Sequence, residues 1–295
     1  RYFDAKGVMA RGLVTMGGNQ QFFDQNGYQV KGKIARAKDG KLRYFDKDSG
    51  NVAANRFAQG DNPSDWYYFG ADGVAVTGLQ KIGQQTLYFD QDGKQVKGKI
   101  VYVNGANRYF DANSGEMAVG KFAEGAKNEW YYFDQTGKAV TGLQKIGQQT
   151  LYFAQDGKQV KGKVVTLADK TIRYFDANSG EMAVGKFVEG AKNEWYYFDQ
   201  SGKAVTGLQK IGQQTLYFDQ NGKQVKGQLV TLADKSIRYF DANSGEMATN
   251  KFVEGSKNEW YYFDQAGKAV TGLQQIGQQT LYFDQNGKQV KGKIV

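Results

Sequence analysis

A phrase ending in two aromatic residues recurs along the entire chain, and its spacing limits what the chain can fold into. The second residue of each pair is phenylalanine, and these phenylalanines mark fourteen repeats in 295 residues. Later repeats follow one another in steps of 20, 22 and 23 residues, so the pattern returns every 65 residues. A period of this length is typical of a solenoid or propeller-like array rather than one compact globule. The fourteen positions are Phe3, Phe23, Phe45, Phe69, Phe89, Phe110, Phe133, Phe153, Phe175, Phe198, Phe218, Phe240, Phe263 and Phe283.

Three kinds of repeat alternate within each super-repeat. The Trp repeat reads WYYFDQTGKAVTG from Trp130, the Lys repeat reads LYFDQDGKQVKG from Leu87, and the acidic repeat reads RYFDANSGEMAVG from Arg108. Each combines alternating aromatic residues, a turn of the form D-x-x-G and a second short run ending in glycine, which indicates a β-hairpin. No segment shows a 3.6-residue apolar period, so almost no helix is expected. We predict an all-β fold: a β-solenoid of about fourteen stacked β-hairpins, with three hairpin types in each super-repeat.

The period of two along a strand separates an inner from an outer face. In the Trp repeat Tyr131 and Phe133 share one face, while Trp130 and Tyr132 share the other. Gly137 is expected to take the left-handed conformation that closes the D-x-x-G turn. We predict that the repeated phenylalanines fill the solenoid interior, because a lone hairpin is marginal in water and must bury a face on its neighbours.

Two further sets of residues are assigned to that interior. Small apolar residues on the second strand of each repeat are expected to face the phenylalanine, as at Val140, Val160 and Ala183. The phenylalanine of the link between repeats, as in GKF, is expected to plug the same interior at Phe57, Phe122, Phe187 and Phe252.

The composition removes several classes of function. The chain has no cysteine and no histidine, which excludes disulfides, thiolate chemistry and most zinc sites. An aspartate follows the phenylalanine in most repeats, but Gly70 and Ala154 take its place in two of them without disturbing the repeat. The aspartate is therefore assigned to turns and not to catalysis. The DQDG stretches lack the further ligands of a calcium loop. We therefore predict no catalytic residue, no metal and no cofactor.

The ends of the chain and its hydropathy bear on its setting. No apolar run is long enough to span a bilayer, so no membrane insertion is expected. The chain starts and stops inside a repeat, and we interpret residues 1–295 as a single repeat domain cut from a longer secreted chain that is extracellular or attached to the cell surface.

The outer face carries the residues that point to a ligand. Tryptophan and tyrosine plates stand beside glutamine and lysine, which suits a sugar ring: the plate covers the C–H face while amide and ammonium groups bond the hydroxyls. Two structural interpretations stay open. The tyrosines could pack between neighbouring hairpins, and the lysines could serve only to keep a long solenoid soluble.

The order and spacing of WYYFDQTGKAVTG, LYFDQDGKQVKGK and RYFDANSGEMAVGKF resemble the C-terminal glucan-binding repeats of streptococcal glucosyltransferases, the glucansucrases. The likeness covers essentially the whole chain. More distantly the chain is similar to choline-binding repeats of cell-wall hydrolases and to receptor-binding repeats of clostridial toxins. The resemblance implies a non-catalytic module that binds α-glucan, such as dextran, while a separate catalytic domain makes glucan from sucrose.

The resemblance also implies pockets between consecutive hairpins, built from an aromatic plate with glutamine and lysine partners. No such pocket is expected near residues 1–40, where Phe22 stands in place of tyrosine and no tryptophan precedes it. The plates carried over are Tyr88, Tyr152, Tyr217 and Tyr282, with Trp66, Trp130, Trp195 and Trp260 beside them. The polar partners carried over are Gln80, Gln144, Gln209, Gln274, Lys97, Lys161, Lys226 and Lys291.

Three other functions are weighed against glucan binding. A choline-binding or teichoic-acid-binding module for cell-wall attachment is the main alternative, because the net charge of +9 suits an anionic wall polymer and a neutral glucan gives no reason for it. Against choline, extra ammonium groups would repel a cation that needs an aromatic cage. A purely structural spacer would use the aromatic residues for packing alone. Nucleic-acid binding is disfavoured, since the lysines are spread by the repeat rather than clustered.

Overall fold

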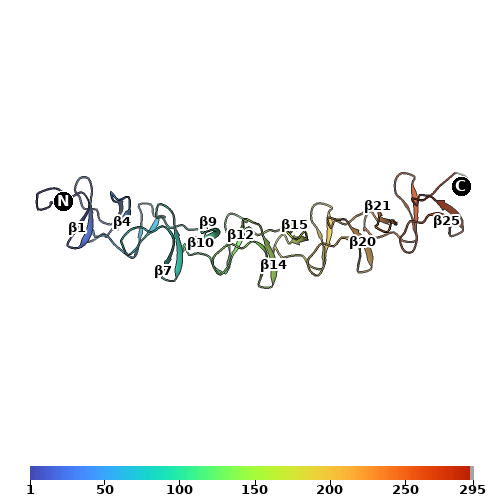
Figure 1. The fold of residues 1–295 in the computed structure, drawn as a ribbon, viewed down its shortest axis with the longest axis horizontal. Coiled ribbons are helices and arrows are strands. Elements are labelled where there is room, and N and C mark those ends of the chain that lie inside the picture. The colour runs from blue at the N-terminus through green and yellow to red at the C-terminus, as the bar shows by residue number, and fades with distance from the viewer. Residues whose placement is uncertain (293–295) are drawn as a thin grey trace. The chain divides into compact units, whose positions relative to one another are not determined.

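The structure is a computed structural model and describes residues 1–292. It divides into two compact units, and each is treated by itself below. Unit 1 comprises Arg1–Gly142 and Phe153–Gln159, and unit 2 comprises Leu143–Tyr152 and Val160–Val295. Within each unit, two-stranded hairpins follow one another in chain order (Figure 1). The described residues contain no helix, as predicted.

Thirteen two-stranded antiparallel sheets are formed by the described residues, and they fall into the three predicted types. The Lys hairpins are β1 (Gly12–Met16) with β2 (Asn19–Phe23), β7 (Gly78–Ile82) with β8 (Gln85–Phe89), β13 (Gly142–Ile146) with β14 (Gln149–Phe153), β19 (Gly207–Ile211) with β20 (Gln214–Phe218), and β25 (Gly272–Ile276) with β26 (Gln279–Phe283). The acidic hairpins are β3 (Lys33–Arg36) with β4 (Leu42–Phe45), β9 (Lys99–Val103) with β10 (Ala106–Phe110), β15 (Lys163–Thr166) with β16 (Ile172–Phe175), and β21 (Gln228–Thr231) with β22 (Ile237–Phe240). The Trp hairpins are β5 (Arg56–Gln59) with β6 (Trp66–Phe69), β11 (Lys121–Glu124) with β12 (Trp130–Phe133), β17 (Lys186–Glu189) with β18 (Trp195–Phe198), and β23 (Lys251–Glu254) with β24 (Trp260–Phe263).

The pairing partner of the aromatic strand differs from the one we predicted. We expected the strand to pair with the run after the D-x-x-G turn, but its main ladder is with the segment before it. The aromatic strand pairs with the segment before it, as β12 does with β11, from Lys121 opposite Phe133 to Glu124 opposite Trp130. After the D-x-x-G turn only one bridge follows, between Phe133 and Ala139. The turn itself is as predicted, since Gly137 has a φ of 74° and its N–H donates to the Asp134 carbonyl at 2.9 Å.

The repeated phenylalanines form the interior, which confirms the central prediction. Phe133 and its equivalents from Phe45 to Phe283 are fully buried. Tyrosine rings cover several of them: Tyr131 and Tyr109 both lie 6.2 Å from Phe133 between ring centroids. Burial of an aromatic ring is the largest favourable contribution available to so small a hairpin. The first repeat differs, because Phe3 is 53% exposed.

The small apolar residues of the second strand lie in the interior only in part. The residue that bridges each phenylalanine precedes the predicted one: Ala139 rather than Val140, Gln159 rather than Val160, and Met182 rather than Ala183. Val140 and Val160 are half-buried, whereas Ala183 is buried although it is not the bridge partner.

The link phenylalanines do not plug the interior. Phe57, Phe122, Phe187 and Phe252 are 37–39% exposed. In each Trp hairpin this phenylalanine is directly opposite the outer tyrosine, and the Phe122 and Tyr132 ring centroids are 4.9 Å apart. The link residue therefore lies on the outer face, because cross-strand partners share a face.

A buried arginine ties three of the four acidic hairpins to the next Trp repeat, which the sequence did not reveal. In the first acidic hairpin Arg43 is also buried, but its Nη2 lies 2.7 Å from Asp39 Oδ2 of the same hairpin. Arg108 is 7% exposed, and its Nη1 donates to the carbonyl of Thr136 at 2.6 Å. Arg173 makes the same bond to the carbonyl of Ser201, also at 2.6 Å. Both carbonyls belong to D-x-x-G turns, so turn carbonyls that lack strand partners accept a bond from each buried guanidinium. Within the described residues, the Nε atoms of Arg108 and Arg173 are buried without a hydrogen-bond partner.

Carboxylates in the acidic turns make stability sensitive to acid. Asp111 Oδ1 accepts the N–H groups of Ser114 and Asn113 at 2.9 and 3.0 Å, and these bonds lower the pKa of Asp111. The same bonds lower the pKa values of Asp46, Asp176 and Asp241. Because the folded-state pKa lies below the ordinary value of 3.8, this stabilisation is present above that pH and is lost as the pH falls through the lower value.

Changing these four aspartates to asparagine should therefore weaken the dependence of stability on acid. Asparagine still accepts the turn N–H bonds but cannot be protonated in this range. Urea unfolding at pH 7 and pH 3 measures the effect: the parent protein should lose more stability between the two pH values than the fourfold variant. An equal loss would contradict this assignment.

Candidate functional site

Trp66 is held at the surface of unit 1 by the backbone of the following Lys repeat. It opens β6, and it is 36% exposed while the adjacent Tyr67 is buried, in accord with the predicted faces. The Gln95 N–H donates to the Trp66 carbonyl at 2.7 Å. This bond fixes the strand that carries the indole without using any side-chain group of Trp66.

A hollow of about 670 Å³ opens beside this tryptophan. Its volume falls in the range of small-molecule sites, which is roughly 300–1,000 Å³. One aromatic ring and several polar groups line it, a composition that suits a hydroxylated ring with one apolar face. We call it the Trp66 hollow and define it by Asp65, Trp66, Lys94, Gln95, Lys97 and Asn113.

The charges in the Trp66 hollow are largely compensated. Lys94 Nζ lies 2.7 Å from Asp65 Oδ2, and this hydrogen bond raises the pKa of Lys94. Lys97 Nζ donates to the carbonyl of Asn113 at 2.9 Å. Three lysines and two aspartates line the hollow, counting Lys99 and Asp90. A lysine ammonium has three donors, so the bond from Lys97 leaves two that a hydroxyl group could accept.

The frame around the tryptophan recurs along the chain. The Gln159, Gln224 and Gln289 N–H groups donate to the Trp130, Trp195 and Trp260 carbonyls, each at 2.7 Å. The acidic residue before each tryptophan pairs with a lysine of the next repeat: Glu129 with Lys158, Glu194 with Lys223, and Glu259 with Lys288, at 2.5–2.8 Å.

The predicted lysines lie close to tryptophan in unit 2 as well. Lys226 Nζ is 5.8 Å from the centroid of the Trp195 ring, and Lys291 Nζ is 5.5 Å from that of Trp260. Lys226 also donates to the Asn243 carbonyl at 3.0 Å, and Lys161 donates to the Asn178 carbonyl at 2.9 Å. The pairing of tryptophan with lysine therefore occurs twice in unit 2, and in unit 1 the corresponding residues Trp66 and Lys97 line the same hollow.

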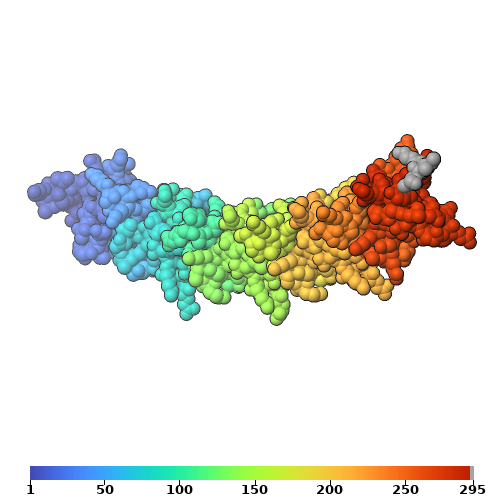
Figure 2. Space-filling model, turned by 45° about the vertical axis from the view of Figure 1, so that its right-hand side comes forward, coloured from blue at the N-terminus to red at the C-terminus, as the bar shows by residue number. Residues whose placement is uncertain are grey.

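The predicted tyrosines and glutamines lie elsewhere. Tyr88 is half-buried and its ring centroid is 5.5 Å from that of Phe110 in the next hairpin. Gln80 pairs with Leu87, and Leu79 pairs with Tyr88, so Gln80 and Tyr88 lie on opposite faces of the β7–β8 hairpin. The tip of this hairpin projects from the surface of unit 1 (Figure 2).

The other copies have similar surroundings. Tyr152 stacks on Phe175 with ring centroids 5.4 Å apart, Tyr217 lies tilted against Phe240 at 5.5 Å, and Tyr282 is half-buried. Gln80, Gln209 and Gln274 each donate from Nε2 to a threonine carbonyl at 2.7 Å, and Gln144 has the same place in its strand.

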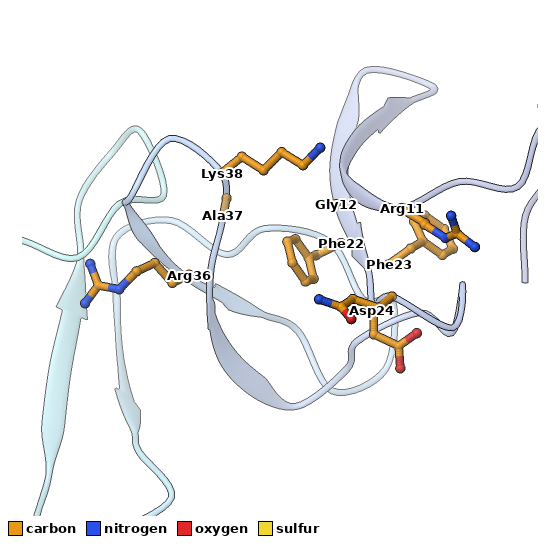
Figure 3. Close-up of a pocket in the computed structure, with 9 residues that line it drawn as sticks. Arg11, Gly12, Phe22, Phe23, Asp24, Arg36, Ala37 and Lys38 are labelled. Atoms are coloured by element: carbon orange, nitrogen blue, oxygen red, sulfur yellow. The ribbon is translucent and has the colours of Figure 1, made fainter.

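A second hollow, of about 770 Å³, lies in the first repeats, where no glucan pocket was expected. It is shown in Figure 3, where Phe22 comes from the β1–β2 hairpin and Lys38 from the turn of the following hairpin. Arg11, Arg36 and Lys38 line it with a single carboxylate, Asp24. The Phe22 ring lies tilted against Phe45, with ring centroids 5.4 Å apart. This basic hollow has no tryptophan, so its chemistry differs from that of the Trp66 hollow.

The described residues contain neither a candidate metal centre nor a helix that could span a membrane. Residues 1–292 contain no group of three or more histidine, cysteine, aspartate or glutamate residues placed to hold a metal ion. Within the same residues, no helix is long and apolar enough to cross a membrane. The aspartates after the phenylalanines bond turn N–H groups, as Asp134 does with Thr136 and Lys138.

Stacked hairpins with a tryptophan on the outer face of each Trp hairpin, one of them in a polar hollow, define a repeat module that binds carbohydrate or cell-wall polymer. The comparison with known families agrees: the chain belongs to the choline-binding repeat family. That family matches residues 10–57, 76–122, 140–187, 205–252 and 270–295. A related cell wall binding repeat matches residues 55–75, 126–139, 186–204 and 250–269, which contain the Trp hairpins or parts of them.

Similar proteins include streptococcal glucosyltransferases. The chain is 53% identical to glucosyltransferase-S of Streptococcus mutans over 253 residues, 86% of this chain and 17% of that protein. It is 39% identical to glucosyltransferase-I of Streptococcus downei, covering 100% of this chain and 24% of the relative. The chain thus spans less than a quarter of the length of these relatives.

Among solved structures, choline binding protein F from Streptococcus pneumoniae shares the fold. It aligns with a TM-score of 0.59 and 23% identity, covering 90% of this chain and 99% of that one. CbpJ from the same species aligns with a TM-score of 0.58 and 22% identity, over 88% of this chain and 100% of that one. At this identity the likeness supports the stacked-hairpin fold alone.

Several residues of the Trp66 hollow escaped the sequence analysis. Lys94, Gln95 and Asn113 are brought to it by the turn of the Lys repeat and that of the next acidic repeat. The signal available was the regular GKQVKGK phrase, in which Lys94 and Lys97 are three residues apart. The contribution of the acidic repeat depends on stacking between hairpins, which no local pattern shows.

Proposed function

We propose that this chain is a non-catalytic module that binds α-glucan, a dextran-like polymer, at several tryptophan sites. The observation that carries the proposal is the exposed Trp66 ring in a hollow that Lys97, Gln95 and Asn113 also line. The carbonyl of Asn113, in the next repeat, accepts a bond from Lys97. The ring would cover the C–H face of a glucose unit, and the ammonium and amide groups would bond its hydroxyls. Compensated charge in the hollow supports a neutral ligand.

The relatives support the choice of ligand and the setting. Both are named glucosyltransferases, and the chain matches only a minor part of each. We infer that the module forms the C-terminal part of a secreted glucosyltransferase that uses sucrose. The module would keep that enzyme on its polymer outside the cell or at the cell surface.

Repetition compensates for weak single sites. One aromatic plate with two or three hydrogen bonds gives a dissociation constant on the order of 1 mM, about 4 kcal/mol. Four tryptophan frames on one chain can engage one polymer together, and linked sites raise the overall affinity by roughly 10²–10⁴ without any new contact.

The second candidate is a module for an anionic wall polymer such as teichoic acid. The basic hollow at Arg11, Arg36 and Lys38 and the net charge of +9 favour it. Choline itself is disfavoured at the Trp66 hollow, because a quaternary ammonium prefers several rings around it and the hollow contributes one ring and three lysines.

Titration with isomaltooligosaccharides and dextran, followed by tryptophan fluorescence, tests the proposal. We expect a saturable change in emission, millimolar affinity for the short sugars and far tighter binding of dextran. Binding that hardly changes between 0.05 and 0.5 M salt would match a neutral ligand, since salt screens only charge interactions. If no glucan alters the emission, the tryptophans serve only for packing and the proposal fails. If the protein binds wall polymer and salt abolishes that binding, the second candidate is favoured.

A further inference from the structure

We propose that the outer end of the β9–β10 hairpin carries a separate hexose-binding site, with Tyr102 as its stacking plate. Tyr102 is 73% exposed, about twice the exposure of Trp66 and Trp130. It belongs to none of the repeated aromatic pairs. A tyrosine that served packing would be covered by its neighbours, and this one is left on the surface beside a hollow.

The hollow beside Tyr102 lies entirely within unit 1 and has a volume of about 280 Å³. Turns of the following Trp and Lys repeats close it opposite the β9–β10 hairpin. We call it the Tyr102 hollow and define it by Tyr102, Gly105, Asn107, Lys138, Gln155 and Asp156.

The polar groups of the Tyr102 hollow are held in place by the fold. Asn107 is directly opposite Tyr102 in the ladder, and its Nδ2 donates to the Asp156 carbonyl at 3.1 Å. This bond fixes the plane of the amide, whose oxygen is an acceptor. Asp156 Oδ1 accepts the Lys158 N–H at 3.0 Å, which orients its carboxylate. Fixed acceptors beside an aromatic plate are what recognition of a sugar ring requires.

The charges favour a neutral ligand here as well. Lys138 and Asp156 contribute one charge of each sign to the hollow. Gly105 and Gly157 add no side chain to its walls, and a Cβ on Gly157 would lie 3.1 Å from the Cβ of Ala139. The hollow therefore offers a flat ring, a balanced pair of charges and room made by glycine.

The other acidic hairpins have the same ladder but different residues at the positions of Tyr102 and Asn107. The pair corresponding to Tyr102 and Asn107 is Arg36 with Leu42, Thr166 with Ile172, and Thr231 with Ile237. An equivalent hollow of about 170 Å³ lies beside Arg36, lined by Leu42, Gln91 and Asp92, with no aromatic side chain among its walls. Stacking alone thus produces a hollow at this place, and only the β9–β10 hairpin equips it with a plate and an amide.

The ligand we assign is a glucose unit of the same α-glucan, so this inference rests on the proposed function. The Tyr102 hollow would add a contact that does not depend on tryptophan. The double variant Tyr102→Thr with Asn107→Ile removes the plate and the amide. It introduces the threonine and isoleucine that the acidic hairpins β15–β16 and β21–β22 have at these positions, so the hairpin is expected to fold. Thr231→Ala, at the equivalent position of β21–β22, is the matched control.

The test is an NMR titration of the full chain with isomaltotriose, read at the Gly105 amide, together with dextran affinity. We expect the Gly105 signal to shift and saturate at millimolar sugar in the parent protein and in the control, and not in the double variant. Dextran affinity of the double variant should fall by about twofold to tenfold, the share of one site among several. A Gly105 signal that stays still while tryptophan emission responds would overturn this site alone. If neither responds, the proposed function fails, and this site with it.

Discussion

Replacing Phe133 by alanine is expected to cost about 3–5 kcal/mol of unfolding free energy, the range for removing a fully buried aromatic ring. Phe133 has no exposed surface, and Tyr131 and Tyr109 cover it. The remaining buried neighbours are Ala118 and Ala123, which are too small to move into the space that the ring would leave. The cavity would therefore persist, and its cost adds to the lost burial.

The same hairpin supplies the control for this prediction. Phe122 lies on β11 and is 38% exposed on the outer face, so Phe122→Ala should cost only about 1 kcal/mol, in line with partial burial. Urea unfolding of both variants measures the difference. Hydrogen exchange should show the loss concentrated in β11–β12 and adjacent hairpins, because each repeat of a solenoid contacts only its neighbours. Equal losses for the two variants would mean that the interior has been misplaced.

The fold was predictable from the sequence because its main determinants are local and repeated. Fourteen phenylalanines in register predict a row of equivalent burial sites, and thirteen of them are buried, Phe3 being the exception. The D-x-x-G phrase requires a left-handed residue at its end, and Gly137 has it. Period two placed Tyr131 inside and Trp130 outside, and burial agrees. The turn and the two faces follow from short consecutive segments, and the row of phenylalanines follows from the repetition of such segments.

The errors arose where pairing between segments decides. Phe122 is directly opposite Tyr132, so it shares the outer face, but this follows only once β11 is known to pair with β12. A strand shifted by one residue presents the opposite face, so an assignment made without the register is easily reversed. The bridge from Phe133 to Ala139 instead of Val140 is the same kind of error.

The residues of the candidate site also separate into those predicted correctly together and those whose place depended on pairing. Trp66 and Lys97 were predicted together, and the structure brings them to one hollow. Tyr88 and Gln80 were carried over on motif likeness, which gives a residue's place in the repeat and not the face on which it lies. Tyr102 breaks the repeat, and a search for what recurs passes over a residue that occurs once.

Removing all four tryptophan plates should abolish most of the affinity for long dextran. In the fourfold variant with alanine at Trp66, Trp130, Trp195 and Trp260, we expect the dissociation constant for dextran to rise by roughly 10²–10⁴, the range by which linked sites exceed single ones. Trp66→Ala alone should change it only about twofold to fivefold, because the remaining sites still engage the polymer. Surface plasmon resonance on immobilised dextran, with far-UV circular dichroism as the test of folding, measures both.

A matched fourfold tryptophan-to-phenylalanine variant separates stacking from a mere loss of bulk. Phenylalanine keeps a flat apolar plate and loses the indole N–H, so this variant should retain a substantial part of the dextran affinity. The Gln95 N–H bond to the carbonyl of residue 66 uses backbone atoms and survives either change, so the frame persists in both variants. If the alanine variant folds and still holds dextran as the parent does, the plates are not the binding surface. The basic hollow at Arg11, Arg36 and Lys38 would then be the place to look for polymer binding.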